Sequence, residues 1–474
     1  MPDDAAARTE VWPDATAQAE AVRSGRASPV ELGQDAVARL RRVDPQLSAL
    51  VGERFDAALA EAAGPLPDGP LRGVPMLRKD LGCHVAGEVT GEGTRWLEGL
   101  PRPVDSALAL SFRAAGLVVL GRTRVPELGT TVTTEPAAYG PTRNPYDLDR
   151  TVGGSSGGSA ALVAAGAVAL AHAGDGGGSI RIPASACGLV GLKPSRGRVS
   201  AGPEVGESWA GATTDGVLTR TVRDTALLLD VISGPQPGDP YTAPPPAGPY
   251  AGEVGADPGR LRVGLLTTPP QPDLAGDPAC TAAVESTGRL LASLGHDVEV
   301  AHPEALGDPE FSRHFNRTVA ADVALALAGF ERLLGREIDD EELEPRNRAY
   351  RAIGRRATAV TYLESRAWLA QFSRRVAGWW AGGFDVLLTP TVNGPPPLLG
   401  TLEDGAAVSR WMPYGAQFNV TGQPAVSLPL HVHEGGLPLG LQLVAAYGRE
   451  DLLLRVAAQL EAAAPWEGRR PGVH

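Results

Sequence analysis

The sequence contains very little lysine. Of its 43 basic residues only Lys79 and Lys193 are lysines, and all the others are arginines. Arginine stays charged in proteins, whereas a lysine can lose its proton near neutral pH. A lysine kept in so arginine-rich a chain can mark a position that needs a neutral amine, although two chance survivors would give the same count.

Cysteine and long hydrophobic runs are scarce as well. Cys83, Cys187 and Cys280 are odd in number and far apart, which argues against a disulfide framework and favours a reducing cytoplasm. The acidic N-terminus (1–12) carries no basic-then-apolar signal pattern, so we expect a cytoplasmic protein. No apolar run reaches the ~18 residues typical of a membrane span; the Ala/Val-rich run 160–173 predicts a buried helix instead.

Patterns for binding metals or polyanions are also missing. The sequence has no HExxH or CxxC motif, and His431 and His433 alternate in a segment that predicts a solvent-facing strand end more readily than a metal pair. The formal net charge of −12 argues against a nucleic acid or an anionic membrane as the main partner. The charge says little about a small-molecule substrate.

Strand and helix patterns alternate along the chain. Ser28-Pro29-Val30-Glu31 combines a capping serine, a proline at the first helical position and an acid three residues on, which predicts a helix start. The alternation indicates an α/β fold, a sheet covered on both sides by helices. We expect a short strand within 69–82 that carries Lys79 into a loop, and a strand followed by a turn within 116–129. Further strands are expected near 261–267, 296–301, 384–390, 425–432 and 440–446, and helices at 278–294, within 308–380 and at 450–462. Residues 130–158 are loop-rich, and 234–260 is a Pro/Gly-rich surface excursion.

Two Gly/Ser-rich stretches, 151–160 and 174–188, each run into an apolar helix-like segment. Loops of this kind at helix starts point several N–H groups in one direction and suit anions. The sequence lacks the Gly-Lys pair of a phosphate loop, and a dinucleotide fingerprint fits poorly. Acyl transfer by a serine beside an oxyanion hole remains, and Ser156 in Gly-x-Ser-x-Gly is one candidate nucleophile, although no histidine stands in a recognisable partner context.

The two stretches resemble the amidase signature family. The matching segments are GGSSGGSAALVAAG (153–166), GDGGGSIRIPASACGLVGLKPSRG (174–197), GVPMLRKDLG (73–82), FNVTGQPAVSLPL (418–430) and GLPLGLQLVA (436–445). The resemblance implies one amidase signature domain over 1–474, with a catalytic core at about 70–200 and a mixed, twisted central sheet. It further implies amide hydrolysis without a metal or an organic cofactor.

The resemblance also implies roles for individual residues. Ser179 would be the nucleophile, Ser155 the serine after a cis peptide bond, and Lys79 the base. Backbone N–H groups of the oxyanion hole would come from Gly176, Gly177, Gly178 and Ser179, with Lys193 in a structural position. Arg181 could touch the substrate, but we expect it to pair with Asp175 and brace the loop. Physical chemistry agrees, because a serine needs a base and a buried lysine whose pKa falls from about 10.4 toward 7–8 can act as one. Asp80, next to Lys79, would point to the opposite face as a loop or salt-bridge residue.

Segments outside the core (11–25, 132–145, 303–311 and 444–461) resemble family members that degrade nylon oligomers. We expect a pocket segment at 127–140, with Gly129 and Thr130 as substrate-binding positions and no arginine or lysine to pair with a carboxylate. The predicted substrates are neutral aliphatic amides, linear or cyclic, such as 6-aminohexanoate oligomers. The family's loop usually has a larger residue at position 176, so Gly176 predicts a looser loop or a roomier acyl pocket.

Several alternatives stay open at this point. A carbamate or aryl-amide hydrolase would use the same three residues. The amidase subunit of a tRNA-dependent amidotransferase fits less well with the acidic chain, and a catalytically silent binding protein is the non-enzymatic alternative. The oligomeric state is also open, with a homodimer as one candidate.

Overall fold

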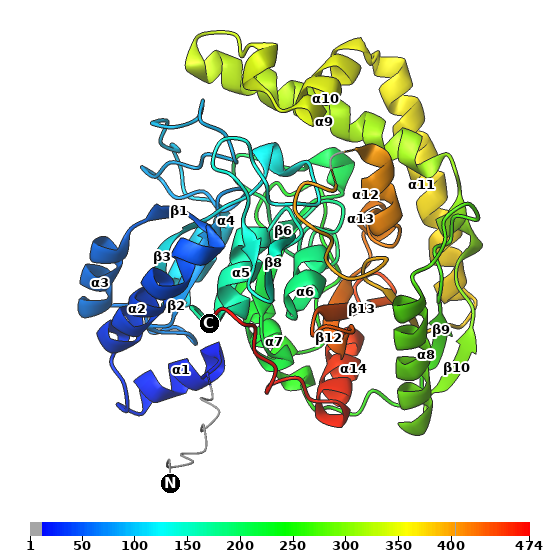
Figure 1. Ribbon diagram of the computed structural model, residues 1–474, viewed down its shortest axis with the longest axis horizontal. Coiled ribbons are helices and arrows are strands. Elements are labelled where there is room, and N and C mark those ends of the chain that lie inside the picture. Colours follow the sequence, from blue (N-terminus) through cyan, green and yellow to red (C-terminus); the bar gives the residue numbers. More distant parts are fainter. Residues whose placement is uncertain (1–11, 403) are drawn as a thin grey trace.

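The computed structural model describes residues 12–402 and 404–474. The N-terminal stretch 1–11, on which part of the cytoplasmic expectation depends, lies outside the described residues. In the described part, eleven strands form one mixed sheet in the order β1-β3-β2-β6-β8-β7-β12-β13-β11-β9-β10, and β4 pairs separately with β5. Helices cover both faces of the sheet (Figure 1), which confirms the predicted α/β class.

The strands are short and mostly buried. Their bounds are β1 (Leu50–Glu53), β2 (Pro75–Lys79), β3 (Val118–Thr123), β4 (Arg143–Asn144), β5 (Asp147–Thr151), β6 (Leu170–Asp175), β7 (Val190–Lys193), β8 (Thr214–Thr219), β9 (Arg262–Leu265), β10 (Asp297–Val300), β11 (Val386–Pro390), β12 (Ala425–Val432) and β13 (Pro438–Ala445).

The α-helices follow the strands along most of the chain. Their bounds are α1 (Ala15–Arg23), α2 (Pro29–Leu47), α3 (Phe55–Ala63), α4 (Ala107–Ala114), α5 (Gly157–Ala164), α6 (Arg181–Cys187), α7 (Val222–Ile232), α8 (Pro278–Ser293), α9 (Phe311–Leu334), α10 (Pro345–Arg356), α11 (Ala359–Ala381), α12 (Gly405–Trp411), α13 (Ala416–Val420) and α14 (Glu450–Ala463).

Local sequence signals account for many of these elements. Helix α2 begins with the predicted capping box, in which the Ser28 side chain accepts the Glu31 N–H and the Glu31 carboxylate accepts the Ser28 N–H. The strand that ends at Lys79, the helix α8 and the closing strand–strand–helix unit lie where the sequence predicts them. No helix in 12–402 or 404–474 combines the length and hydropathy needed to cross a membrane.

Two segment predictions were wrong. The run 160–173 is not one helix: α5 stops at Ala164, Gly166 adopts φ +72°, and the chain continues into the buried strand β6. Short apolar runs do not distinguish a buried helix from a buried strand. The excursion 234–260 is also not wholly outside the core, because Tyr250 is 1% exposed and packs in the largest apolar cluster.

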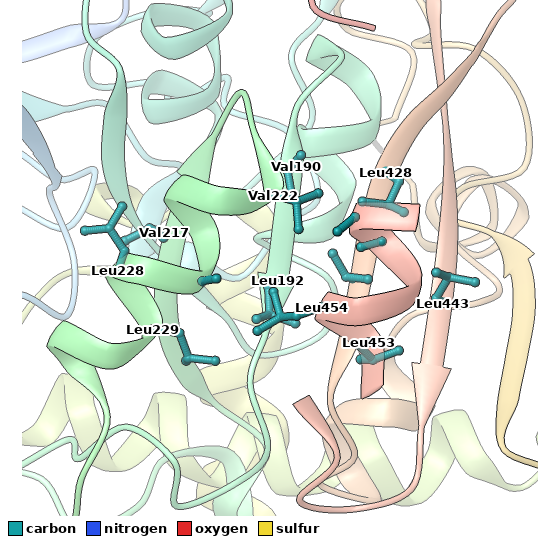
Figure 2. Packing of buried hydrophobic residues seen from close by; sticks show 14 of the residues in the cluster. Val190, Leu192, Val217, Val222, Leu228, Leu229, Leu428, Leu443, Leu453 and Leu454 are labelled. Atoms are coloured by element: carbon teal, nitrogen blue, oxygen red, sulfur yellow. The ribbon is translucent and has the colours of Figure 1, made fainter. Parts of the chain in front are cut away.

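The largest cluster joins one face of the sheet to its helices. Figure 2 shows α7 and α14 laid over the sheet, with Leu228 and Leu454 among the side chains that fill the space between. On the opposite face α2, α3, α5 and α6 pack in a second cluster. Helices α9 and α10 lie across one end of the molecule, at the top of Figure 1. The candidate site lies between α9 and the ends of β2 and β6, the third and fourth strands in the order of the sheet.

Candidate active site

The candidate site forms where two parallel strands end. Strands β2 and β6 run side by side, with Leu77 opposite Ala171, and their last residues are Lys79 and Asp175. Because parallel strands end at the same edge of a sheet, the loop after β6 meets the end of β2 there. A cavity of about 440 Å³ opens at this edge, and Lys79, Ser155 and Ser179 all line it.

Lys79 is buried and contacts a serine. Its Nζ lies 2.8 Å from Ser155 Oγ and 3.2 Å from the Gly174 carbonyl oxygen. Burial lowers the pKa of Lys79 to about 8, against the opposing charges of Asp215 and Asp175. About a tenth of this amine is therefore neutral at pH 7, and a base for a serine hydroxyl must be neutral.

Ser155 follows a cis peptide bond at Gly154, as the resemblance implies. A Cβ on Gly154 would lie 2.2 Å from the Thr133 carbonyl oxygen, so only glycine fits there. The neighbouring Ser156 is 0% exposed and bonds with the Gly174 backbone, its Oγ donating to the carbonyl oxygen at 3.2 Å. Ser156 does not line the cavity, so the Gly-x-Ser-x-Gly alternative does not fit the structure.

Ser179 lies in the loop that leads into α6, with its side chain at the cavity. The Asp175 carboxylate shapes this loop by accepting the N–H groups of Gly178 at 2.6 Å and Ile180 at 3.2 Å. The predicted oxyanion donor Gly178 is thus already used. Among the hydrogen bonds of the described residues none uses the N–H groups of Gly176, Gly177 or Ser179, and of these three residues Gly176 and Ser179 line the cavity.

Arg181 braces the same loop from inside the protein. Its Nε and Nη2 donate to the two Asp175 oxygens, both at 2.9 Å, and Nη1 donates to Gln442 Oε1 at 2.6 Å. Burial would raise the pKa of Asp175, but the charge and hydrogen bonds of Arg181 outweigh it and hold that pKa well below its usual range. Arg181 is itself 1% exposed and does not line the cavity, whereas Asp175 does, so Arg181 supports the loop from behind.

Two further residues near Lys79 were missed by the sequence reasoning. His172 Nδ1 accepts the Lys79 backbone N–H at 3.3 Å, so its proton is on Nε2, which lies 3.2 Å from Asp215 Oδ1. Burial lowers the pKa of His172 and keeps the ring neutral. A Cβ on Gly174 would stand within 4 Å of both Asp215 Oδ1 and Lys79 Nζ, and the charge of Asp215 raises the pKa of the nearby amine against the effect of burial.

Comparisons with known proteins identify the family. A family model described as Amidase matches residues 31–454. The chain belongs to the amidase family. It is 44% identical over 486 residues to the 6-aminohexanoate-cyclic-dimer hydrolase of Paenarthrobacter ureafaciens (98% of this chain, 97% of that protein) and 38% identical over 476 residues to the putative amidase AmiB2 of Mycobacterium tuberculosis (97% and 98%).

Solved structures agree. A structure of 6-aminohexanoate cyclic dimer hydrolase matches with a TM-score of 0.94 at 43% identity, over 98% of this chain and 99% of that one. A bacterial aryl acylamidase of the amidase signature family matches with a TM-score of 0.89 at 26% identity, over 98% and 99%. This amidase therefore has the amidase signature fold and is an amide-bond hydrolase, as the sequence predicted.

The predicted substrate segment of the amidase needs correction. Gly129 lines the cavity, but Thr130 does not: its hydroxyl donates to Asn347 Oδ1 at 2.8 Å and to the Glu127 carbonyl oxygen. Likewise Thr134 donates to the Gly153 carbonyl oxygen. The threonines hold the loop together. Sequence patterns do not reveal the direction of a loop side chain such as Thr130, because its partner Asn347 comes from the distant helix α10.

The other basic and acidic predictions have clear places. Asp80 pairs with Arg122 at 2.5 Å, the predicted salt bridge. Lys193 is 1% exposed, donates to the Pro194 carbonyl oxygen at 2.8 Å and does not line the cavity. Gly176 does not leave the predicted extra room, because the indole of Trp209 occupies the space beside it.

Proposed function

We propose that this amidase hydrolyses carboxamide bonds through an acyl-enzyme at Ser179, with Ser155 relaying a proton to Lys79. The observation that carries the proposal is the buried Lys79 amine, 2.8 Å from Ser155 Oγ, with its pKa lowered to about 8. A lysine in this state can accept a serine proton, whereas an arginine cannot.

The steps follow from these positions. Ser179 Oγ attacks the carbonyl carbon as its proton passes to Ser155 Oγ, whose own proton passes to Lys79 Nζ. The oxygen of the tetrahedral intermediate takes hydrogen bonds from the N–H groups of Gly176, Gly177 and Ser179. The proton then returns through Ser155 to the leaving nitrogen, and the C–N bond breaks. Water attacks the acyl-enzyme in the same way and releases the carboxylic acid and free Ser179.

Charges in the cavity support neutral amides as substrates. Arg102, which lines the cavity, is paired with Glu92, while the carboxylates of Glu204, Asp215 and Asp322 also line it. A substrate carboxylate would be repelled there. Val323, Ala326 and Phe330 of α9 supply an apolar wall. Together with the relatives named for 6-aminohexanoate cyclic dimer, these features favour neutral aliphatic amides, linear or cyclic, such as 6-aminohexanoate oligomers.

An aryl-amide hydrolase is the second candidate. It draws support from the likeness to an aryl acylamidase and from aromatic cavity residues, Trp209 and Phe330. A carbamate hydrolase would use the same steps with a carbamoyl-enzyme. A screen of linear amides, cyclic amides, anilides and carbamates ranks the three by kcat/KM, and the aliphatic proposal fails if anilides or carbamates exceed aliphatic amides.

The acyl-enzyme itself is tested with a fluorophosphonate probe. Wild type should be labelled at Ser179 and should turn over amide, whereas Ser179→Ala should lose both. Ser155→Ala keeps the nucleophile without the relay, so we expect slow residual labelling and turnover reduced by about 10²-fold or more. Ser156→Ala is the matched control because that serine is buried away from the cavity. If Ser156→Ala abolished labelling and Ser179→Ala did not, the proposal would be wrong.

A further inference from the structure

The glycine at position 176 is matched to Trp209. A Cβ on Gly176 would lie 2.8 Å from Cε3 of the indole and 3.1 Å from Cγ2 of Thr213. Non-bonded carbon atoms normally come no closer than about 3.5 Å. No side chain therefore fits at position 176 while the indole stands there, and the indole fills the space that a larger residue of the oxyanion loop would take.

The turn that carries Trp209 is held in an uncommon conformation. Trp209 and Ala210 both adopt left-handed φ angles, +50° and +59°. Non-glycine residues keep such angles only where their surroundings enforce them, and they concentrate at functional sites. Here the Asp322 carboxylate, from α9, accepts the N–H groups of both residues. On the other side Asn419 Nδ2 donates to the Ala212 carbonyl oxygen at 3.0 Å, so the turn is fixed from two directions.

The indole is a wall of the catalytic cavity. Trp209 lines the cavity together with Gly176 and Ser179. Its outer side packs edge-on against Phe315 of α9, with ring centroids 6.3 Å apart and an interplanar angle of 74°. Aromatic packing of this kind adds to the rigidity that the backbone hydrogen bonds supply. The wall is therefore fixed, not a side chain free to swing away.

The positions of Ser155 and Trp209 indicate which part of the substrate, acyl or amine, lies against this wall. Ser155 Oγ lies 3.3 Å from where a Cβ on Gly129 would stand, whereas Trp209 adjoins Gly176. In the proposed mechanism the proton reaches the leaving nitrogen from Ser155, so the amine lies on the Ser155 side of the carbonyl. The acyl chain extends away from it, along the oxyanion loop and the indole.

We propose that Trp209 determines acyl-chain specificity: with Gly176 it forms a flat wall that accepts acyl chains unbranched next to the carbonyl and excludes branched ones. The inference rests on the proposed acyl-enzyme at Ser179 and adds the substrate class of its acyl side. A linear or cyclic chain of methylene groups lies flat along such a wall, whereas a methyl branch on the first carbon meets the ring.

The test uses p-nitroanilides of butyric and isobutyric acid, which share one leaving group. Wild type should favour the butyryl compound, and Trp209→Ala should raise the isobutyryl-to-butyryl ratio of kcat/KM by at least about tenfold, since one methyl group is worth about 10- to 200-fold in a tight pocket. Gly176→Ala alone should slow both compounds. The double variant Gly176→Ala/Trp209→Ala should be faster than Gly176→Ala, because the vacated space accepts the added methyl group.

Controls separate the possible failures. Butyramides of n-butylamine and sec-butylamine carry the branch on the amine side, and their kcat/KM ratio should not change in Trp209→Ala; a shift confined to this pair would overturn the assignment. Fluorophosphonate labelling of Ser179 reports a folded site. An unlabelled wild type contradicts the proposed function, whereas labelled variants with an unchanged acyl ratio contradict the Trp209 inference alone. Should Trp209→Ala not be labelled, Trp209→Phe keeps a smaller ring and must shift the acyl ratio in the same direction.

Discussion

The pH dependence of kcat/KM should follow the proton on Lys79. Burial lowers the pKa of this amine from 10.5 to about 8. The difference corresponds to destabilisation of the charged form, relative to the neutral one, by roughly 3 kcal/mol. At pH 7 about a tenth of the enzyme then has a neutral lysine, against about 0.03% at the ordinary pKa, a gain of roughly 300-fold in active enzyme. Only the neutral form accepts the serine proton, so kcat/KM should rise with pH.

The assay measures kcat/KM on a neutral amide from pH 5.5 to 9.5. Its logarithm should climb with a slope near one and level off above about pH 8. Glu127 precedes the cavity residues Leu128 and Gly129, and burial raises its pKa to about 7, so its titration falls in the same pH range as that of Lys79. Glu127→Gln keeps an oxygen that can accept a hydrogen bond from Asn347, and it should leave the rising part (the limb) of the kcat/KM profile at the same pH.

Substitution of the base completes this prediction. Lys79→Arg keeps the positive charge and cannot lose it, so turnover should fall by about 10²-fold or more with the protein still folded. A flat profile between pH 6 and 9, a limb that disappears in Glu127→Gln, or more than about a tenth of the activity left in Lys79→Arg would each refute the general-base role, since such a base typically contributes at least 10²-fold.

Two further predictions concern the neighbours of the relay. The negative charge of Asp215 opposes the lowering of the Lys79 pKa. Asp215→Asn should therefore lower that pKa further and shift the rise of kcat/KM to lower pH. A rise that stays at the same pH or shifts to higher pH would contradict this role. Gly129 adopts φ +65°, and a Cβ there would lie 2.6 Å from Leu81 Cδ2 and 3.3 Å from Ser155 Oγ. Gly129→Ala should therefore disturb the relay serine and slow propionamide and a cyclic amide alike, by about 10- to 100-fold, whereas a loss confined to the cyclic amide would mean that Gly129 shapes the pocket only.

Sequence patterns predicted those parts of the site that depend on local chain geometry. Ser155 and Ser179 each lie in a glycine-rich loop directly before a helix, and Lys79 ends a strand, so short motifs locate all three. The Asp175–Arg181 pair is also local, because the two residues are six apart in the sequence, and its carboxylate organises the loop between them.

The walls of the cavity depend on segments far apart in the sequence. Trp209 is held by Asp322, and Thr130 turns to Asn347, contacts that span 113 and 217 residues. No sequence periodicity or motif predicts such pairs. The prediction that Thr130 contacts the substrate failed for this reason, and Asp215 escaped notice because a single acid after two threonines has no recognisable pattern.

Composition does not distinguish the roles of the two lysines, whereas their contacts do. Scarcity singled out both, and both are buried with lowered pKa values, Lys193 to about 7, a lower value than that of Lys79. A neutral amine alone therefore does not identify a base. Lys193 Nζ donates to a carbonyl oxygen, which has no proton to exchange, whereas Lys79 Nζ adjoins the hydroxyl of Ser155 at the edge of a cavity. Only the second arrangement allows a proton to move between the amine and a substrate, because only there does a hydroxyl connect the two.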